Sequence, residues 1–165
     1  MERLFASWRH AYVTRDDGGD RGCVFCLAQQ SPEAGSLIVH EGATAFVILN
    51  LYPYNAGHVM VVPRRHVARL ADLADDEMVE LARLTRLAEQ AITAAYRPQG
   101  LNVGMNLGRS AGAGVADHLH IHLVPRWTGD TNFMTIVGDV RVLPEELAQS
   151  AARLRPLFAD LAAAG

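Results

Sequence analysis

One stretch of the chain decides the fold: Asp117-His118-Leu119-His120-Ile121-His122-Leu123-Val124-Pro125-Arg126. Apolar residues alternate with histidines, a pattern typical of a strand with two different faces. Side chains alternate sides along a strand, so the three histidines point the same way, about 6 to 7 Å apart at successive positions. The opposite face carries apolar residues that can join a core, namely Leu119, Ile121 and Leu123. The pattern predicts a strand over residues 118–124.

Three imidazoles in a row are costly to bury, because each ring nitrogen needs a partner. Three interpretations follow from the residues. The histidines are structural and satisfied by neighbours, or they form a three-histidine metal centre for metal-assisted hydrolysis. In the third interpretation one histidine is a nucleophile and its two neighbours orient it.

The remaining pattern predicts four more strands and two helices. We expect strands over residues 37–40, 44–49, 58–63 and 101–107, with a turn over 51–57 that carries Pro, Asn and Gly. Apolar residues at helical spacing predict a helix over 75–96, ended by Arg97-Pro98-Gln99-Gly100, and a second helix from Pro144 to about Ala163. Strands in adjacent runs favour an α+β fold with a mostly antiparallel sheet.

Length and composition narrow the class of protein. The chain has 165 residues, of which 50% are hydrophobic and 20% charged, so we expect one globular domain over residues 1–165. A net charge of −3 without long blocks of one sign gives no reason to expect nucleic-acid binding. No apolar run is long enough for a membrane span, and Met1-Glu2-Arg3-Leu4 does not begin a signal peptide. We therefore expect a cytoplasmic protein with no membrane partner.

The chain has two cysteines, Cys23 and Cys26, which follow a glycine-rich segment over residues 16–22 that we expect to be a loop. Two residues between cysteines indicate a metal half-site or a redox pair rather than a structural disulfide. Tetrahedral zinc requires two further ligands.

The segment His118–Val124 resembles the signature of the histidine triad superfamily, His-x-His-x-His followed by two apolar residues. Members are nucleotide hydrolases and transferases. The resemblance extends to Asn50–Pro63, which looks like the family's nucleoside-binding turn and next strand. Residues 125–133 resemble the dinucleoside polyphosphate branch, and over roughly residues 8 to 158 the chain is most similar to bacterial diadenosine tetraphosphate phosphorylases.

The resemblance implies a role for each triad histidine. The middle one, His120, is the expected nucleophile, which attacks an α-phosphorus and forms a nucleotidyl-histidine. His122 is expected beside the transferring phosphate, where it hydrogen-bonds the phosphate oxygens or the bridging oxygen. His118 is the first triad residue. The other members of the expected site bind the nucleotide, and they are Asn50 at the ribose, His58, Asn106, Ser110, Gly112, Gly114 and Trp127.

The loop before the triad departs from the family pattern. Many relatives place Gly-Gln-Ser or Gly-Gln-Thr there, whereas this chain has Ala113-Gly114-Val115. Backbone amides of the glycine-rich loop, with Arg109 or Ser110, are expected to contact the phosphate instead.

The resemblance also implies a structural zinc and a quaternary structure. Zinc-containing relatives complete the cysteine pair with a residue at the end of the strand after the nucleoside turn and with the first triad histidine. The implied ligands here are Cys23, Cys26, His66 and His118, and no organic cofactor is expected. The implied fold is a five-stranded antiparallel sheet with packed helices, usually a two-fold homodimer.

The expected reaction splits diadenosine tetraphosphate with inorganic phosphate into ATP and ADP. Hydrolysis to ATP and AMP differs only in the acceptor. The residues also leave open hydrolysis of nucleoside phosphoramidates and a non-catalytic nucleotide-binding module. Hexose-1-phosphate uridylyl transfer is disfavoured because that group has Gln in place of the third histidine, which is His122 here.

Overall fold

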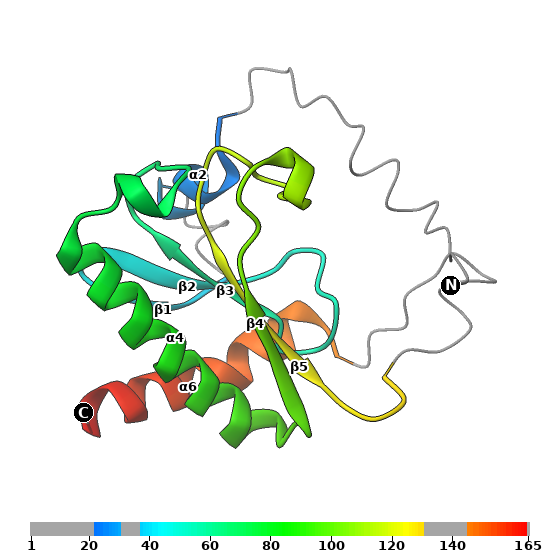
Figure 1. Cartoon of the computed structure of the whole chain (residues 1–165). Coiled ribbons are helices and arrows are strands. Elements are labelled where there is room, and N and C mark those ends of the chain that lie inside the picture. The colour runs from blue at the N-terminus through cyan, green and yellow to red at the C-terminus, as the bar shows by residue number, and fades with distance from the viewer. Residues whose placement is uncertain (1–21, 31–36, 131–144, 165) are drawn as a thin grey trace, which may run out of the picture.

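The computed structural model describes residues 22–30, 37–130 and 145–164 (Figure 1). Of the loop predicted over residues 16–22, only Gly22 lies among them. Within these ranges the chain forms an α+β fold around one sheet, as the sequence predicts.

The sheet has five strands in the order β1-β2-β3-β5-β4, and every neighbouring pair is antiparallel. The strands are β1 (Ile38–Glu41), β2 (Ala45–Leu49), β3 (Val59–Pro63), β4 (Gly100–Gly104) and β5 (Ile121–Arg126). The predicted five-stranded antiparallel sheet is confirmed, and the predicted turn over residues 51–57 joins β2 to β3.

Most strand boundaries differ from the prediction by one or two residues, and two differ by three residues for the same reason. The triad strand begins at Ile121 rather than His118, because the backbone leaves the ladder before it: the Leu119 N–H donates to the Val67 carbonyl at 2.7 Å instead of to β3. The predicted strand over 101–107 ends at Gly104, whose partner on β5 is His122. β5 begins only one residue before His122, so β4 has almost no pairing partner beyond Gly104.

The alternation of faces survives this change of boundary. Leu119 and Leu123 are buried in the core between the sheet and the two long helices, and Ile121 packs against the same core. The histidine side chains lie on the opposite face of the sheet.

The long helix α4 (Asp75–Tyr96) has the predicted bounds. At its start the Glu77 carboxylate accepts a hydrogen bond from the Ala74 N–H at 2.8 Å. At its end Arg97 adopts a left-handed conformation with φ of 46°. The second long helix, α6 (Leu147–Ala164), begins a few residues after the predicted start at Pro144, which lies outside the described residues.

Short helices complete the fold. The helix α2 (Val24–Gln30) was not predicted, because seven residues are too few for a periodic pattern. Two 3₁₀ turns, η1 (Leu70–Asp72) and η2 (Arg109–Ala111), lie in the connections before α4 and after β4. No described helix is long and apolar enough to span a bilayer.

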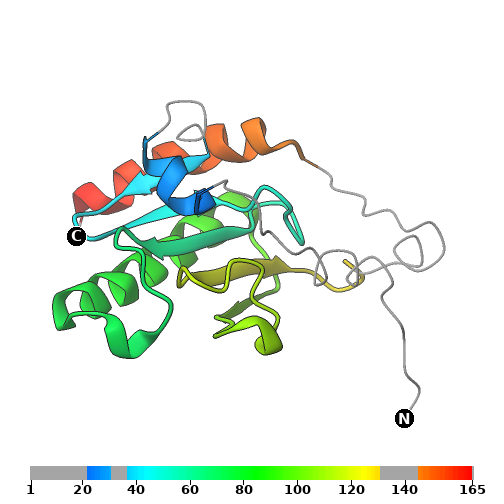
Figure 2. The same ribbon diagram turned by 90° about the horizontal axis from the view of Figure 1, so that it is seen from above.

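The sheet separates two cores (Figures 1 and 2). On one face α4 packs on β2, β3 and β5, and α6 packs on β1 and β2, with core residues such as Val59, Val61 and Phe158. On the other face the short helix α2 places Phe25 and Ala28 on four sheet residues, which are Phe46, Ile48, Met60 and Val62. The second face also carries the histidines.

Candidate active site and metal site

The three triad histidines line up on the α2 face of the sheet. His118 and His120 are buried, and His122 is half-buried. The ring centres of His120 and His122 lie 4.8 Å apart, and the ring of Phe25 lies 5.3 Å from His118 and 5.1 Å from His120. Phe25 therefore holds both rings from the side of α2.

The hydrogen bonds of His120 define which of its nitrogens is reactive. Its Nδ1 lies 2.8 Å from the backbone carbonyl oxygen of His118. A carbonyl only accepts, so Nδ1 carries the proton and donates it to this oxygen. The neutral ring then has its lone pair on Nε2, which is the arrangement that a nitrogen nucleophile requires.

The same reasoning assigns the proton of His122 through His58, the buried residue just before β3. The Tyr54 backbone N–H donates to His58 Nδ1 at 3.0 Å, and the Asn50 Nδ2 group lies 3.3 Å from the same atom. His58 Nδ1 is thus an acceptor, and the proton of a neutral His58 is on Nε2, 3.0 Å from His122 Nδ1. His122 accepts on Nδ1 and presents an N–H at Nε2.

Burial keeps the triad rings neutral near pH 7. Desolvation lowers the pKa of His120, although the bond to the His118 carbonyl opposes this. Desolvation, helped by the neighbouring His120, lowers the pKa of His122 to about 4. A neutral nucleophile beside a neutral N–H donor is the result.

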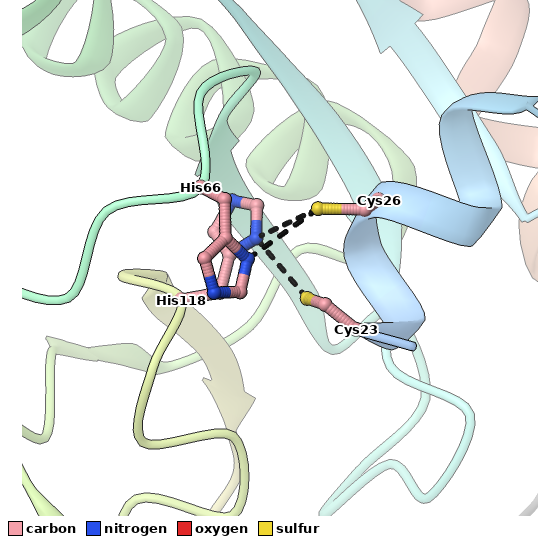
Figure 3. Close-up of side chains that lie close together, drawn as sticks. All are labelled: Cys23, Cys26, His66 and His118. Atoms are coloured by element: carbon pink, nitrogen blue, oxygen red, sulfur yellow. Dashed lines mark hydrogen bonds between the residues drawn. The ribbon is translucent and has the colours of Figure 1, made fainter. Parts of the chain in front are cut away.

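A second cluster lies next to the triad, where Cys23 and Cys26 point from the start of α2 toward His66 and His118 (Figure 3). The four ligand atoms lie within 4.8 Å of one another. Cys23 Sγ is 3.2 Å from His118 Nδ1, and Cys26 Sγ is 3.6 Å from the same nitrogen and 3.4 Å from His66 Nδ1. The predicted set is thus brought together from α2, the segment after β3 and the triad.

This donor set fits zinc. Tetrahedral bonds of about 2.3 Å to sulfur and about 2.0 Å to nitrogen place a sulfur and a nitrogen ligand about 3.5 Å apart. Three sulfur–nitrogen distances of 3.2, 3.4 and 3.6 Å agree with this value. His118 Nε2 lies 2.9 Å from the Pro63 carbonyl oxygen. The proton is therefore on Nε2, and the lone pair of Nδ1 faces the two sulfurs, as a metal ligand requires.

The predicted nucleotide-binding residues occupy two loops and the segment just after β5. Asn50 lies in the turn before β3, where its Oδ1 accepts from the Tyr52 N–H at 3.0 Å. Asn106 lies after β4 and its Nδ2 donates to the Gly112 carbonyl at 3.4 Å. Ser110 is exposed in η2, Gly112 has φ of 90°, and Gly114 lies just before Val115, which packs on the α2-side core. Trp127 follows β5 directly.

Several residues that support the site were not singled out from the sequence. Phe25 packs on the triad, the Tyr54 ring stacks on His58 at 5.1 Å, and Asn55 and Asp130 bond each other between two loops. Asn55 and Asp130 lie within the segments that carry the family resemblance. Their mutual contact is long-range, and no pattern in the sequence indicates it.

Comparison with known proteins identifies the class. The HIT domain family model matches residues 31–129. An AP-4-A phosphorylase of Mycobacterium tuberculosis is 52% identical over 154 residues, which cover 89% of this chain and 79% of that protein. A bis(5'-nucleosyl)-tetraphosphatase [asymmetrical] of Schizosaccharomyces pombe is 34% identical over 96 residues, which cover 58% of this chain and 52% of that protein.

A solved structure supports the same family. The Zn-bound histidine triad family protein from Mycobacterium smegmatis superposes with a TM-score of 0.70 at 27% identity, covering 89% of this chain and 100% of that one. The chain belongs to the HIT domain family, and the predicted resemblance is confirmed.

Proposed function

We propose that this protein is a nucleotidyl transfer enzyme that cleaves diadenosine tetraphosphate with inorganic phosphate to give ATP and ADP. The similarity to the M. tuberculosis AP-4-A phosphorylase over most of both chains supports the substrate and the acceptor. The observation that carries the chemistry is the bond from His120 Nδ1 to the His118 carbonyl, because it leaves the Nε2 lone pair free.

In the first step, the His120 Nε2 lone pair attacks the α-phosphorus of one adenylyl half. A nitrogen–phosphorus bond forms, the bond from that phosphorus to the bridging oxygen breaks, and ATP leaves with the electron pair. The His120 ring gains a positive charge, which its N–H bond to the buried carbonyl stabilises. The N–H of His122 Nε2 donates to a phosphate oxygen or to the bridging oxygen as negative charge develops there.

In the second step, an oxygen of inorganic phosphate attacks the adenylyl-histidine. A phosphorus–oxygen bond forms, the nitrogen–phosphorus bond breaks and returns its electron pair to His120, and ADP is released. In this proposal His118 fixes the position of the carbonyl that orients His120, and the nucleotide lies against Asn50 and the glycine-rich loop. That loop contributes Asn106, Ser110, Gly112 and Gly114, and Trp127 lies at the far end of β5. His58, which is fully buried, orients His122 rather than contacting the nucleotide.

We also propose that Cys23, Cys26, His66 and His118 hold a structural zinc, which closes its coordination with four protein ligands and supplies no activated water. The donor geometry and the Zn-bound relative support this. Bound zinc would fix the position of the His118 side chain, and with it the His118 backbone carbonyl that orients His120. Elemental analysis of protein purified without a metal-affinity tag should find close to one zinc per chain, and less than about 0.1 would contradict the site.

The acceptor is tested by product analysis of diadenosine tetraphosphate incubated with and without phosphate. ATP and ADP formed only with phosphate is the expected result, and His120→Ala serves as the inactive control. ATP and AMP formed regardless of phosphate would make the protein a hydrolase, the second candidate, which the similarity to the S. pombe tetraphosphatase favours.

Absence of turnover under both conditions would contradict the proposed substrate. A nucleoside 5'-phosphoramidate would then be assayed, and binding of AMP without any turnover would indicate a nucleotide-binding module instead.

A further inference from the structure

Asp130 is the centre of a polar network at the end of β5. Its side chain is only 9% exposed. The Arg126 guanidinium donates to both carboxylate oxygens, from Nε to Oδ2 at 2.6 Å and from Nη2 to Oδ1 at 2.8 Å. Oδ2 also accepts from the Trp127 backbone N–H at 3.1 Å and from Asn55 Nδ2 at 2.9 Å. A paired and bonded carboxylate of this kind is a rigid anchor.

Asn55 brings the turn before β3 into this network. Its Nδ2 group donates to Asp130 and also to the Pro125 carbonyl at 2.8 Å, so both N–H bonds of the amide are used. Both acceptors belong to β5 or to the residues just after it. The Asn55 side chain therefore connects two segments that are about 70 residues apart in the sequence.

The turn held in this way carries the residues that face the nucleotide in the proposed function. Asn55 follows Tyr54, whose N–H and ring both contact His58, and the His58 backbone N–H donates to the Asn55 carbonyl at 3.2 Å. Asn50 lies at the start of the same turn. Gly57 packs so closely on the ring of Tyr96 that an added Cβ would lie 2.5 Å from it.

We propose that Asn55 and Asp130 form a clamp that positions the nucleoside-binding turn against the triad histidines, a role that rests on the proposed function. Tyr96 supports the turn from the helix side, and the clamp fixes it to β5. Asn55 and Asp130 touch no reacting atom and are positioning residues. Loss of the clamp frees the turn and lowers nucleotide affinity, while the bond from His120 Nδ1 to the His118 carbonyl, which lies outside the turn, is kept.

Asn102 provides a matched control. It is an exposed asparagine on β4 whose Oδ1 accepts from Arg126 Nη1 at 2.8 Å, so it bonds the same network but does not contact the turn. Substitution to Asp distinguishes the two positions. Asn102→Asp still accepts from the guanidinium, whereas Asn55→Asp can no longer donate and faces the Asp130 carboxylate.

The test compares Asn55→Ala, Asn55→Asp, Asn102→Ala and Asn102→Asp in the full chain. For the Asn55 variants we expect KM for diadenosine tetraphosphate to rise about tenfold or more, with the larger effect for Asp, while kcat falls by a smaller factor than KM rises. The Asn102 variants should stay within about twofold of the unchanged protein. Equal KM values for both positions, or a fall in kcat alone, would overturn the clamp.

Two further measurements separate this result from failure of the proposed reaction. Calorimetric binding of AMP should weaken about tenfold in Asn55→Ala and not in Asn102→Ala. Amide hydrogen exchange over residues 50–57 should speed up in Asn55→Ala and also in Asp130→Asn, even if the unchanged protein turns over no diadenosine tetraphosphate. Unchanged exchange in both variants would overturn the clamp whatever the substrate is.

Discussion

At the scale of single residues, the site is a set of neutral imidazoles whose protons are assigned by fixed partners. The His118 carbonyl takes the Nδ1 proton of His120, and the Pro63 carbonyl takes the Nε2 proton of His118. Tyr54 and His58 together direct the proton of His122. Each ring thus presents a defined nitrogen, and in the proposed function these are a lone pair for attack on His120, a lone pair for zinc on His118 and an N–H for the phosphate on His122.

The nucleophile can be removed without disturbing the rest of the site. His120→Ala should reduce turnover of diadenosine tetraphosphate by about 10³-fold or more, because no other described nitrogen has the same free lone pair at this position. Binding of AMP should be largely retained, since the turn and the loops are unchanged. His40→Gln is the control, because His40 stacks on Phe158 of α6, away from the triad, and this variant should keep normal turnover. Full activity of His120→Ala would exclude it as the nucleophile.

The half-buried His122 makes stability depend on pH with a defined sign. Its pKa is lowered from 6.5 to about 4 in the folded protein, so the unfolded chain binds a proton at higher pH than the folded one. Above pH 6.5 His122 has no effect on the pH dependence of the free energy of unfolding. That free energy falls as the pH drops from about 6.5 to about 4, and the decrease levels off below about pH 4.

The gap between the two pKa values corresponds to about 3 kcal/mol at most. Urea unfolding at a series of pH values should show this decline in the unchanged protein and a smaller one in His122→Gln, which has no imidazole to protonate. Identical pH profiles for the two proteins would show that His122 does not titrate in this way.

At the scale of elements, the short helix α2 links the metal site to the nucleophile. It has only seven residues, too few to be stable alone, and is held by Phe25 and Ala28 in the core and by Cys23 and Cys26 at its start. Phe25 packs on two of the triad rings. A change in the metal site therefore reaches His120 through both α2 and His118.

Loss of the Cys26 thiolate should disrupt the proposed zinc site. Cys26→Ala should lower bound zinc from about one per chain to less than about 0.1 and lower the melting temperature, because metal binding contributes directly to folding. Val24→Ala, at a side chain that is 58% exposed on the same helix, should retain zinc. Elemental analysis and thermal melting measure both effects. Full zinc content in Cys26→Ala would remove this residue from the ligand set.

At the scale of the whole molecule, the sheet separates stability from chemistry. The larger core and both long helices lie on one face of the sheet (Figures 1 and 2), whereas the triad histidines and the Cys2His2 cluster lie on the face that α2 covers. This division is typical of sites built from loops on a rigid scaffold.

The homodimer is a prediction about the whole molecule. Among the described residues β4 is an edge strand of the sheet, and its Val103 and Gly104 are exposed, so the strand can pair with a second chain. Sedimentation equilibrium should give a mass of about twice 17.9 kDa. A mass of one chain over the whole concentration range would contradict the dimer.

Residue patterns alone predicted the sheet, both long helices and the family, because these depend on local periodicity and on one dense motif. The alternation from His118 to Val124 separates a core face from a chemical face whatever the exact strand boundary. The bounds of α4 follow from its apolar spacing and from Arg97–Gly100 beyond it. The Cys2His2 set followed from the family resemblance, and the four side chains do converge.

Three features could not be predicted from the chain alone: where the triad leaves the strand ladder, which ring nitrogens carry protons and what holds the turn in place. Each of these depends on contacts between distant segments: Leu119 with Val67, His58 with His122, and Asn55 with Asp130. The position of α2 over the histidines is of the same kind. A sequence pattern reports the preferences of neighbouring residues, whereas a hydrogen bond between remote segments exists only once the chain has packed.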